Sequence, residues 1–122
     1  MLLAKSRFEA GSVKDLTVQA MEEAKKTPSK ASISDGDLYV ISAVEAGTGK
    51  TLMFASFHGD TDGLATAPAL AAVHAVATTL APAALIFGLD ANTYASRPPP
   101  GVAVAYSRTL GTAAFDRRPA IA

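Results

Sequence analysis

The spacing of hydrophobic and polar residues divides the first ninety residues of the chain into alternating helical and extended segments. Hydrophobic residues recur at helical spacing over 13–26 and again over 66–81, which predicts two amphipathic helices. Residues 38–44 and 51–57 are rich in β-branched and aromatic side chains and are separated by a turn sequence with two glycines, so they predict a β-hairpin. Residues 83–88 are continuously apolar, as is typical of a strand covered on both faces.

The residues at the ends of the two predicted helices support their boundaries. Ser12 is expected to cap the first helix, with Asp15 in its first turn beside the unpaired amide groups. Thr66 is expected to cap the second helix, and Pro82 ends it because proline cannot continue a helix.

Three polar residues follow the two strands that flank the second helix. The order of strand, helix and strand has the length of a βαβ unit, which makes the two strands parallel. His58 follows the first of these strands, and Asp90 follows the second. Because the carboxyl ends of parallel strands meet at one edge of a sheet, we expect these side chains to converge there. Asn92, two residues after Asp90 on an extended segment, should project to the same side.

An imidazole, a carboxylate and a carboxamide together can bind a phosphate and a hard metal ion. Each residue also has a simpler interpretation: His58 as a hydrogen-bonded structural histidine, and Asp90 with Asn92 as residues of a turn. Asp60 is a further metal candidate, whereas Asp62 in the same glycine-containing turn is expected to shape the loop.

Composition narrows the possible classes of protein. A length of 122 residues predicts one domain, and the balance of 11 basic and 11 acidic residues provides no overall field to attract nucleic acid. After Asn92, four arginines are accompanied by one aspartate, which suits either a phosphate-bearing ligand or a solvated C-terminus. The absence of cysteine excludes disulfides and thiolate sites. No apolar run reaches the length of a membrane span, so we expect a soluble intracellular protein without a membrane partner.

One segment is similar to the end of a nucleotide-binding P-loop. Residues 46–51 read Ala-Gly-Thr-Gly-Lys-Thr, but Val44 occupies the position of the required first glycine, and an apolar strand follows in place of a helix. A P-loop needs a helix there because the amide groups of its first turn hold the phosphates. The segment is therefore predicted to be a hairpin turn.

The strand sequences around the candidate site resemble the endonuclease/exonuclease/phosphatase superfamily, which has the deoxyribonuclease I-like fold. Residues 52–58 resemble the family's strand that ends in a site histidine. Residues 84–92 resemble its apolar strand ending in Gly-Asp-x-Asn, here with Leu89 inserted between the glycine and the aspartate. The resemblance covers about residues 38–94 and implies an α/β fold: a partial deoxyribonuclease I-like sandwich with a β-hairpin, a βαβ unit and flanking helices.

The resemblance also implies an activity, namely hydrolysis of phosphoesters with Mg²⁺. Carried onto this sequence, Asp90 would orient or deprotonate the attacking water close to the metal. Asn92 would donate a hydrogen bond to a phosphate oxygen, and His58 would bind the scissile phosphate or assist proton transfer. The substrate would be a nucleic acid or a phosphorylated small molecule.

Other parts of the family's pattern are missing. Glu45 lies on the hairpin and does not match the family's metal-binding glutamate, and residues 115–122 contain no histidine to match its C-terminal Asp-His motif. We therefore expect the chain to be a partial domain of this family. The alternative to a hydrolase is an inactive family member that serves as a binding or structural module. Exposed sheet edges in such a domain would favour self-association.

Overall fold

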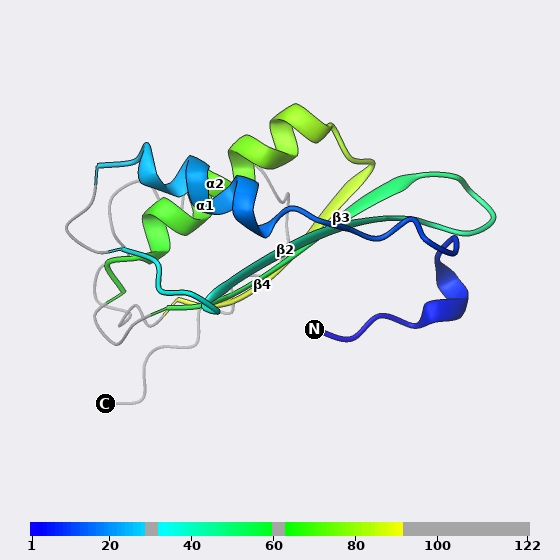
Figure 1. Ribbon diagram of the computed structural model, residues 1–122, viewed down its shortest axis with the longest axis horizontal. Helices are drawn as coiled ribbons and strands as arrows, with labels where there is room; N and C mark the ends of the chain where they lie inside the picture. The colour runs from blue at the N-terminus through cyan, green and yellow to red at the C-terminus, as the bar shows by residue number, and fades with distance from the viewer. Residues whose placement is uncertain (29–31, 60–62, 92–122) are drawn as a thin grey trace, which may run out of the picture.

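The described part of the chain folds into one mixed β-sheet and two α-helices. The computed structural model describes residues 1–28, 32–59 and 63–91. In chain order the elements are a 3₁₀ turn η1 (Lys5–Arg7), β1 (Lys14–Asp15), α1 (Thr17–Lys25), β2 (Leu38–Val44), β3 (Thr51–His58), α2 (Thr66–Leu80) and β4 (Ala84–Asp90). The strands lie in the order β1-β2-β3-β4. Both helices lie on the same side of the sheet, and α1 packs mainly against α2 (Figure 1). The α/β class predicted from the sequence is confirmed.

The predicted hairpin is present, and its turn is not a nucleotide-binding loop. β2 pairs antiparallel with β3 from Leu38 opposite Phe57 to Val44 opposite Thr51. Gly47 and Gly49 in the connection have φ angles of 89° and 67°, a region that side chains with a Cβ rarely adopt. Gly47 and Gly49 therefore allow the chain to reverse its direction. Lys50 is followed by β3 and not by the helix that a P-loop needs.

The predicted βαβ unit is also present. β4 pairs parallel with β3, and α2 connects them. α2 ends at Leu80, one residue before the predicted boundary, where Ala81 adopts a left-handed conformation and Pro82 follows. Thr66 begins the helix but does not cap it, because its hydroxyl donates a hydrogen bond to the Ala91 carbonyl 2.8 Å away.

The predicted start of the first helix is wrong by four residues. Lys14 and Asp15 pair with β2, and α1 begins only at Thr17. The Ser12 hydroxyl donates to the Glu9 carbonyl and accepts from the Val44 amide, so it holds the approach to the strand and does not cap a helix. Pairing with an available sheet edge therefore outweighs the helical periodicity of this segment.

The last strand differs from its prediction in both length and burial. It runs two residues further than expected and includes Asp90 as its last residue. It is not covered on both faces: exposed and half-buried residues alternate along it, because β4 lies at the end of the four described strands. The continuous apolar run therefore belongs to an outer strand of the described sheet.

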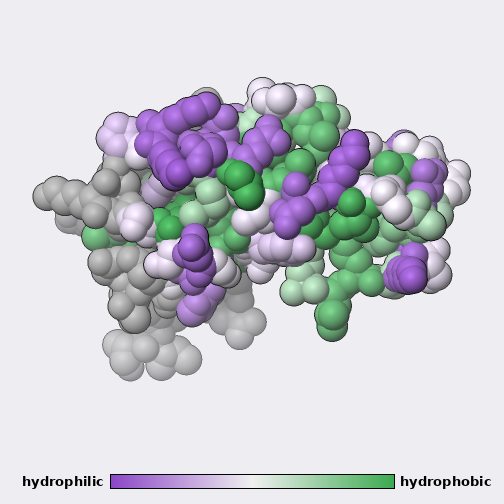
Figure 2. Space-filling view, viewed as in Figure 1, coloured by the Kyte–Doolittle hydropathy of each residue, from purple (hydrophilic) through white to green (hydrophobic). Residues whose placement is uncertain are grey.

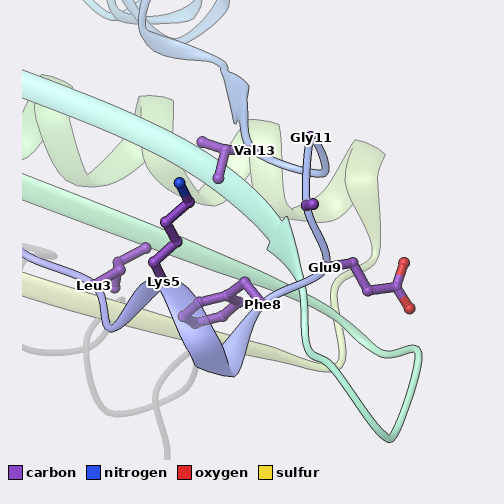
Figure 3. A pocket seen from close by; sticks show the side chains of 7 residues that line it. Leu3, Lys5, Phe8, Glu9, Gly11 and Val13 are labelled. Atoms are coloured by element: carbon purple, nitrogen blue, oxygen red, sulfur yellow. The ribbon is translucent and has the colours of Figure 1, made fainter.

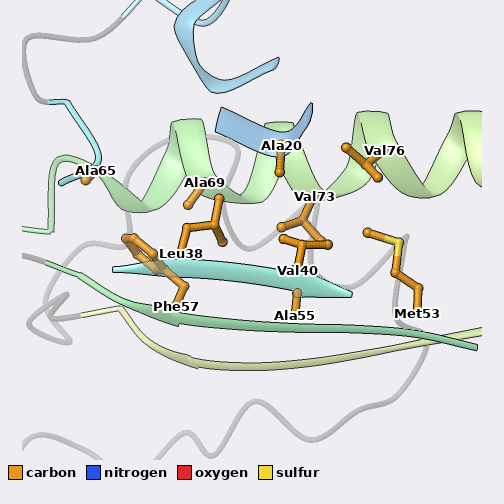
Figure 4. Close-up of a cluster of buried hydrophobic side chains, with 10 residues drawn as sticks. All are labelled: Ala20, Leu38, Val40, Met53, Ala55, Phe57, Ala65, Ala69, Val73 and Val76. Atoms are coloured by element: carbon orange, nitrogen blue, oxygen red, sulfur yellow. The ribbon is translucent and has the colours of Figure 1, made fainter. Parts of the chain in front are cut away.

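The main hydrophobic core lies between the sheet and the helices (Figure 4). β2 and β3 each direct alternate residues into it, and α2 covers them. Its buried members are Ala20, Leu38, Val40, Met53, Ala55, Phe57, Ala65, Ala69, Val73 and Val76. Several are alanines, whose small side chains let the helix backbones approach the sheet closely.

A smaller cluster lies on the opposite face of the sheet. Ile41, Ala43 and Phe54 are buried there under the N-terminal segment, and the Phe8 ring meets the Phe54 ring edge-on, with centroids 5.6 Å apart. This cover reaches only part of the face, since Tyr39 on β2 and Ile86 on β4 remain 45% and 56% exposed. One face of the sheet is thus covered by helices and the other only in part.

The arginines after Asn92 lie outside the described residues, as do residues 102–106, whose sequence is typical of a strand. Within the described ranges, no helix is both long and apolar enough to cross a bilayer.

Candidate functional site

The structure brings two of the predicted site residues together. His58 and Asp90 are the last residues of β3 and β4 and are directly paired in the parallel register. The His58 Nε2 atom lies 3.9 Å from the Asp90 Oδ2 atom. The predicted convergence at the carboxyl edge of the sheet is therefore present for this imidazole and this carboxylate.

Backbone contacts after the two strands hold this edge together. The Gly59 amide donates a 2.8 Å hydrogen bond to the Asp90 carbonyl, which ties the end of β3 to the end of β4. A Cβ atom at Gly59 would lie 3.1 Å from the Asp90 carbonyl oxygen and 3.3 Å from that of Ala91. A glycine is therefore required by the close approach of two backbones.

The other side of His58 and the start of α2 are also anchored. The His58 amide donates a 2.9 Å hydrogen bond to the carbonyl of Asp37, the residue before β2. The end of β3 is therefore bonded to the chain on both sides. Thr66 is fully buried, and its bond to the Ala91 carbonyl joins the first turn of α2 to the residue after β4. Sequence reasoning missed Gly59 and Thr66 as supports of the site. The glycine directly after the strand was the available signal for the first, whereas nothing local marks the second.

Two further hydroxyl groups share the face that carries His58. Ser56 lies two residues before His58 on β3, and Tyr39 is paired with Ser56 across the hairpin. Because side chains alternate along a strand, all three project to the same face. The Tyr39 side chain is well exposed, and Ser56 is half-buried. Sequence reasoning missed these neighbours, although counting back in twos from His58 finds Ser56.

The His58 and Asp90 side chains are open to solvent. They are 73% and 62% exposed, and their separation is that of an ion pair that forms only when the imidazole is protonated. Solvent screens such a pair, so its contribution to folding stability is about 1 kcal/mol at most. Both side chains are therefore exposed, and the pair adds little to folding stability.

The remaining site candidates, Asp60 and Asn92, lie outside the described residues. Among the residues that the structure does describe, no group of three or more His, Asp or Glu side chains is placed to hold a metal ion. Of the two predicted metal-binding residues, Asp90 is the one that lies in the described part of the chain.

A pocket of about 290 Å³ lies at the other end of the sheet (Figure 3). It is formed by the N-terminal segment, which is anchored there by the bond from the Glu9 amide to the Val44 carbonyl. Its lining residues are Leu3, Lys5, Phe8, Glu9, Ala10, Gly11 and Val13. His58 and Asp90 take no part in it, so the pocket and the candidate site are separate features.

Over the described residues, the fold and the site together define an α/β protein with a four-stranded mixed sheet and a histidine–aspartate pair at the carboxyl ends of two parallel strands. No family model matches the chain, and neither a curated protein nor a solved structure matches it.

Proposed function

We propose that the chain is a phosphoester hydrolase-like protein of the nuclease or phosphatase type, built on part of a deoxyribonuclease I-like sandwich. The observation that carries this proposal is the pairing of His58 with Asp90 at the carboxyl ends of β3 and β4. This edge is where α/β proteins commonly bind ligands. The two side chains are of the types that hydrolysis needs, because a carboxylate can accept a proton from water and an imidazolium can stabilise phosphate charge.

We propose Mg²⁺ as the metal ion of this site, because it can be held by a single protein carboxylate when the substrate supplies further oxygen ligands. Mg²⁺ is commonly held by one or two carboxylates together with substrate phosphates and water. Asp90 supplies one carboxylate, and no larger ligand group forms among the described residues. When bound, Mg²⁺ would supply positive charge to the phosphate oxygens. Asp60 is proposed as a second ligand on its place in the sequence alone.

The separation of the pair limits how the two side chains can act. A gap of 3.9 Å leaves no room for a phosphorus atom between them, so both act from one side of a bound ester. Asp90 accepts a proton from the attacking water, whose oxygen forms a new bond to phosphorus as the ester P–O bond breaks. Asn92 and the protonated form of His58 donate hydrogen bonds to non-bridging phosphate oxygens. The leaving oxygen takes its proton from solvent. The proposed substrates are nucleic acids or phosphorylated small molecules.

Hydrolysis of a generic phosphodiester, bis(p-nitrophenyl) phosphate, in the presence and absence of Mg²⁺ tests this proposal. Asp90→Asn should lower kcat by about 10²- to 10⁴-fold, the usual contribution of a general base, without changing thermal stability appreciably. Glu22→Gln on α1 is the matched control, since it also removes one exposed carboxylate. His58→Gln should lower activity, whereas His74→Gln on the exposed side of α2 should not. Equal activity in the wild type and Asp90→Asn would overturn the proposal.

The exposure of the pair favours a second candidate, a catalytically inactive binding or structural module. Catalytic groups are most effective where water is excluded, and both side chains here are largely solvated. This candidate predicts a folded chain that hydrolyses neither the diester nor p-nitrophenyl phosphate but still binds inorganic phosphate in a manner that depends on His58. A Mg²⁺-dependent rate well above background would rule it out.

A further inference from the structure

Within the described residues, the outer edge of β4 lacks four features that normally prevent strands from pairing between molecules. Edge strands are usually short, or carry lysine, proline or a bulge. β4 is seven residues long, and its sequence Ala-Leu-Ile-Phe-Gly-Leu-Asp contains no charge before Asp90 and no proline. All seven of its residues pair in unbroken register with β3, so it has no bulge. Its outer side is paired with no other described strand.

The two faces of β4 are also incompletely covered. Leu85, Phe87 and Leu89 project toward the helices and contact the main core, yet each is only half-buried. The residues on the same face of β3 are almost fully buried, with Met53 at 0% and Phe57 at 3% exposure. The cover from α2 thus falls short of the last strand. On the opposite face Ile86 is 56% exposed.

The sequence of β4 is complementary to itself in one antiparallel register. If Phe87 lies opposite Phe87 of a second copy, then Leu85 lies opposite Leu89 of the second copy, and these half-buried side chains form one apolar row. Residues opposite each other in an antiparallel pair have Cβ atoms about 4.5–5.5 Å apart, which is close enough for this packing.

The other face of β4 fits the same register. Ile86 lies opposite Gly88 of the second copy, and a Cβ atom at Gly88 would meet nothing within 4 Å, so the space beside it is open to the isoleucine side chain. Ala84 lies opposite Asp90 of the second copy, which means that no like charges face each other. Each of the four kinds of pair is therefore compatible with close contact.

We propose that two copies of this chain associate through their β4 edges, in antiparallel register about Phe87, so that the four described strands of each copy join into one continuous sheet. The interface is isologous, because the same strand contributes to both sides. This association does not depend on the proposed hydrolase activity, since His58 and Asp90 lie at the end of the strand and each site belongs to one copy. A single strand pair buries less than a standard interface of about 800 Å² per partner, so we expect a dissociation constant of about micromolar or weaker.

Sedimentation equilibrium of the full chain over a range from low to several hundred micromolar, on the order of the expected constant, tests the association. The wild type should shift from monomer to dimer. Ile86→Lys should weaken association roughly tenfold or more, because it places a charge on the edge strand and brings the two introduced lysines close together on one face of the joined sheet. Val18→Lys is the matched control: Val18 is 78% exposed on α1, where Figure 2 shows polar side chains gathered, and its replacement should leave the dimer intact.

Cysteine cross-linking tests the register independently of whether the lysine variant folds. The natural chain has no cysteine, so an introduced thiol has no competitor. A mixture of Ile86→Cys and Gly88→Cys chains should form a mixed disulfide several-fold faster than either variant alone. A wild type that stays monomeric at every concentration overturns the proposal and assigns the edge to another segment or another protein. A dimer without preferential cross-linking in the mixture overturns the register.

Discussion

The two outer strands of the described sheet are built in opposite ways. β1 consists of two charged, exposed residues, Lys14 and Asp15, and the chain turns directly from it into α1. β4 has seven residues, none of them charged before its last position. A short, charged edge strand has few backbone groups with which a second strand can pair. A long apolar edge strand can form hydrogen bonds with a second strand along its whole length. The difference shows that protection of an edge is a local property, set strand by strand, within one small sheet.

The largest expected effect is on the free energy of unfolding, and it should differ between β3, which the helices cover, and β4, which they cover only in part. Phe57 on β3 is 3% exposed, whereas Phe87 on β4 is half-buried. Phe57→Ala should lower the free energy of unfolding by about 3–5 kcal/mol, the usual cost of removing a fully buried ring. Phe87→Ala should cost clearly less in dilute, monomeric protein. Urea denaturation at low protein concentration measures both, and equal losses would show that β4 is as well covered as β3.

The same substitution at two glycines should have opposite effects. Gly59→Ala forces a Cβ atom against two backbone carbonyls at the junction of β3 and β4 and should cost about 1–3 kcal/mol. At Gly88 the Cβ atom meets open space, so Gly88→Ala should increase stability by about 0.5–1 kcal/mol by restricting the unfolded chain.

Thermal unfolding of the wild type and the two glycine variants measures both changes in stability, the expected loss for Gly59→Ala and the expected gain for Gly88→Ala. Destabilisation by Gly88→Ala would mean that the outer side of β4 is already filled.

The smallest effect concerns the protected edge. The Thr17 amide donates a 2.8 Å hydrogen bond to the Asp15 carboxylate, and this bond lowers the pKa of Asp15 from its ordinary value of 3.8. Because the folded pKa is the lower one, the stabilisation is present above 3.8 and is lost as pH falls through the folded value. Asp15 is exposed, so the change should be small.

Thermal unfolding of the wild type and Asp15→Asn at successive pH values measures this contribution. The wild type should be the more stable protein near neutral pH, and the difference should shrink in acid. A constant difference at all pH values would contradict the assigned hydrogen bond.

Much of the secondary structure could be predicted because its signals are local. The hairpin follows from two β-rich runs around a glycine turn, and the end of α2 follows from Pro82. The start of α1 could not be predicted in this way: the spacing of Val13 and Leu16 is helical, but Lys14 and Asp15 bond to a strand more than twenty residues away. The prediction that β4 is covered on both faces was wrong for a similar reason: an apolar run does not reveal how many strands lie beside it.

The site shows the same division. The order strand–helix–strand was enough to predict that His58 and Asp90 meet, since parallel pairing brings both carboxyl ends to one edge. The support by Gly59 and Thr66 depends on backbone carbonyls at Asp90 and Ala91, which no local pattern connects to them.

The sequence by itself determined the two helices, the hairpin and the last strand in outline, and which side chains end the two parallel strands, because periodicity and chain order act over short distances. Only the tertiary structure decided which strands lie at the edges, how far the helices cover them, and the 3.9 Å separation of His58 and Asp90. Those features depend on contacts between residues that are distant in the chain, and such contacts form only when the elements pack together.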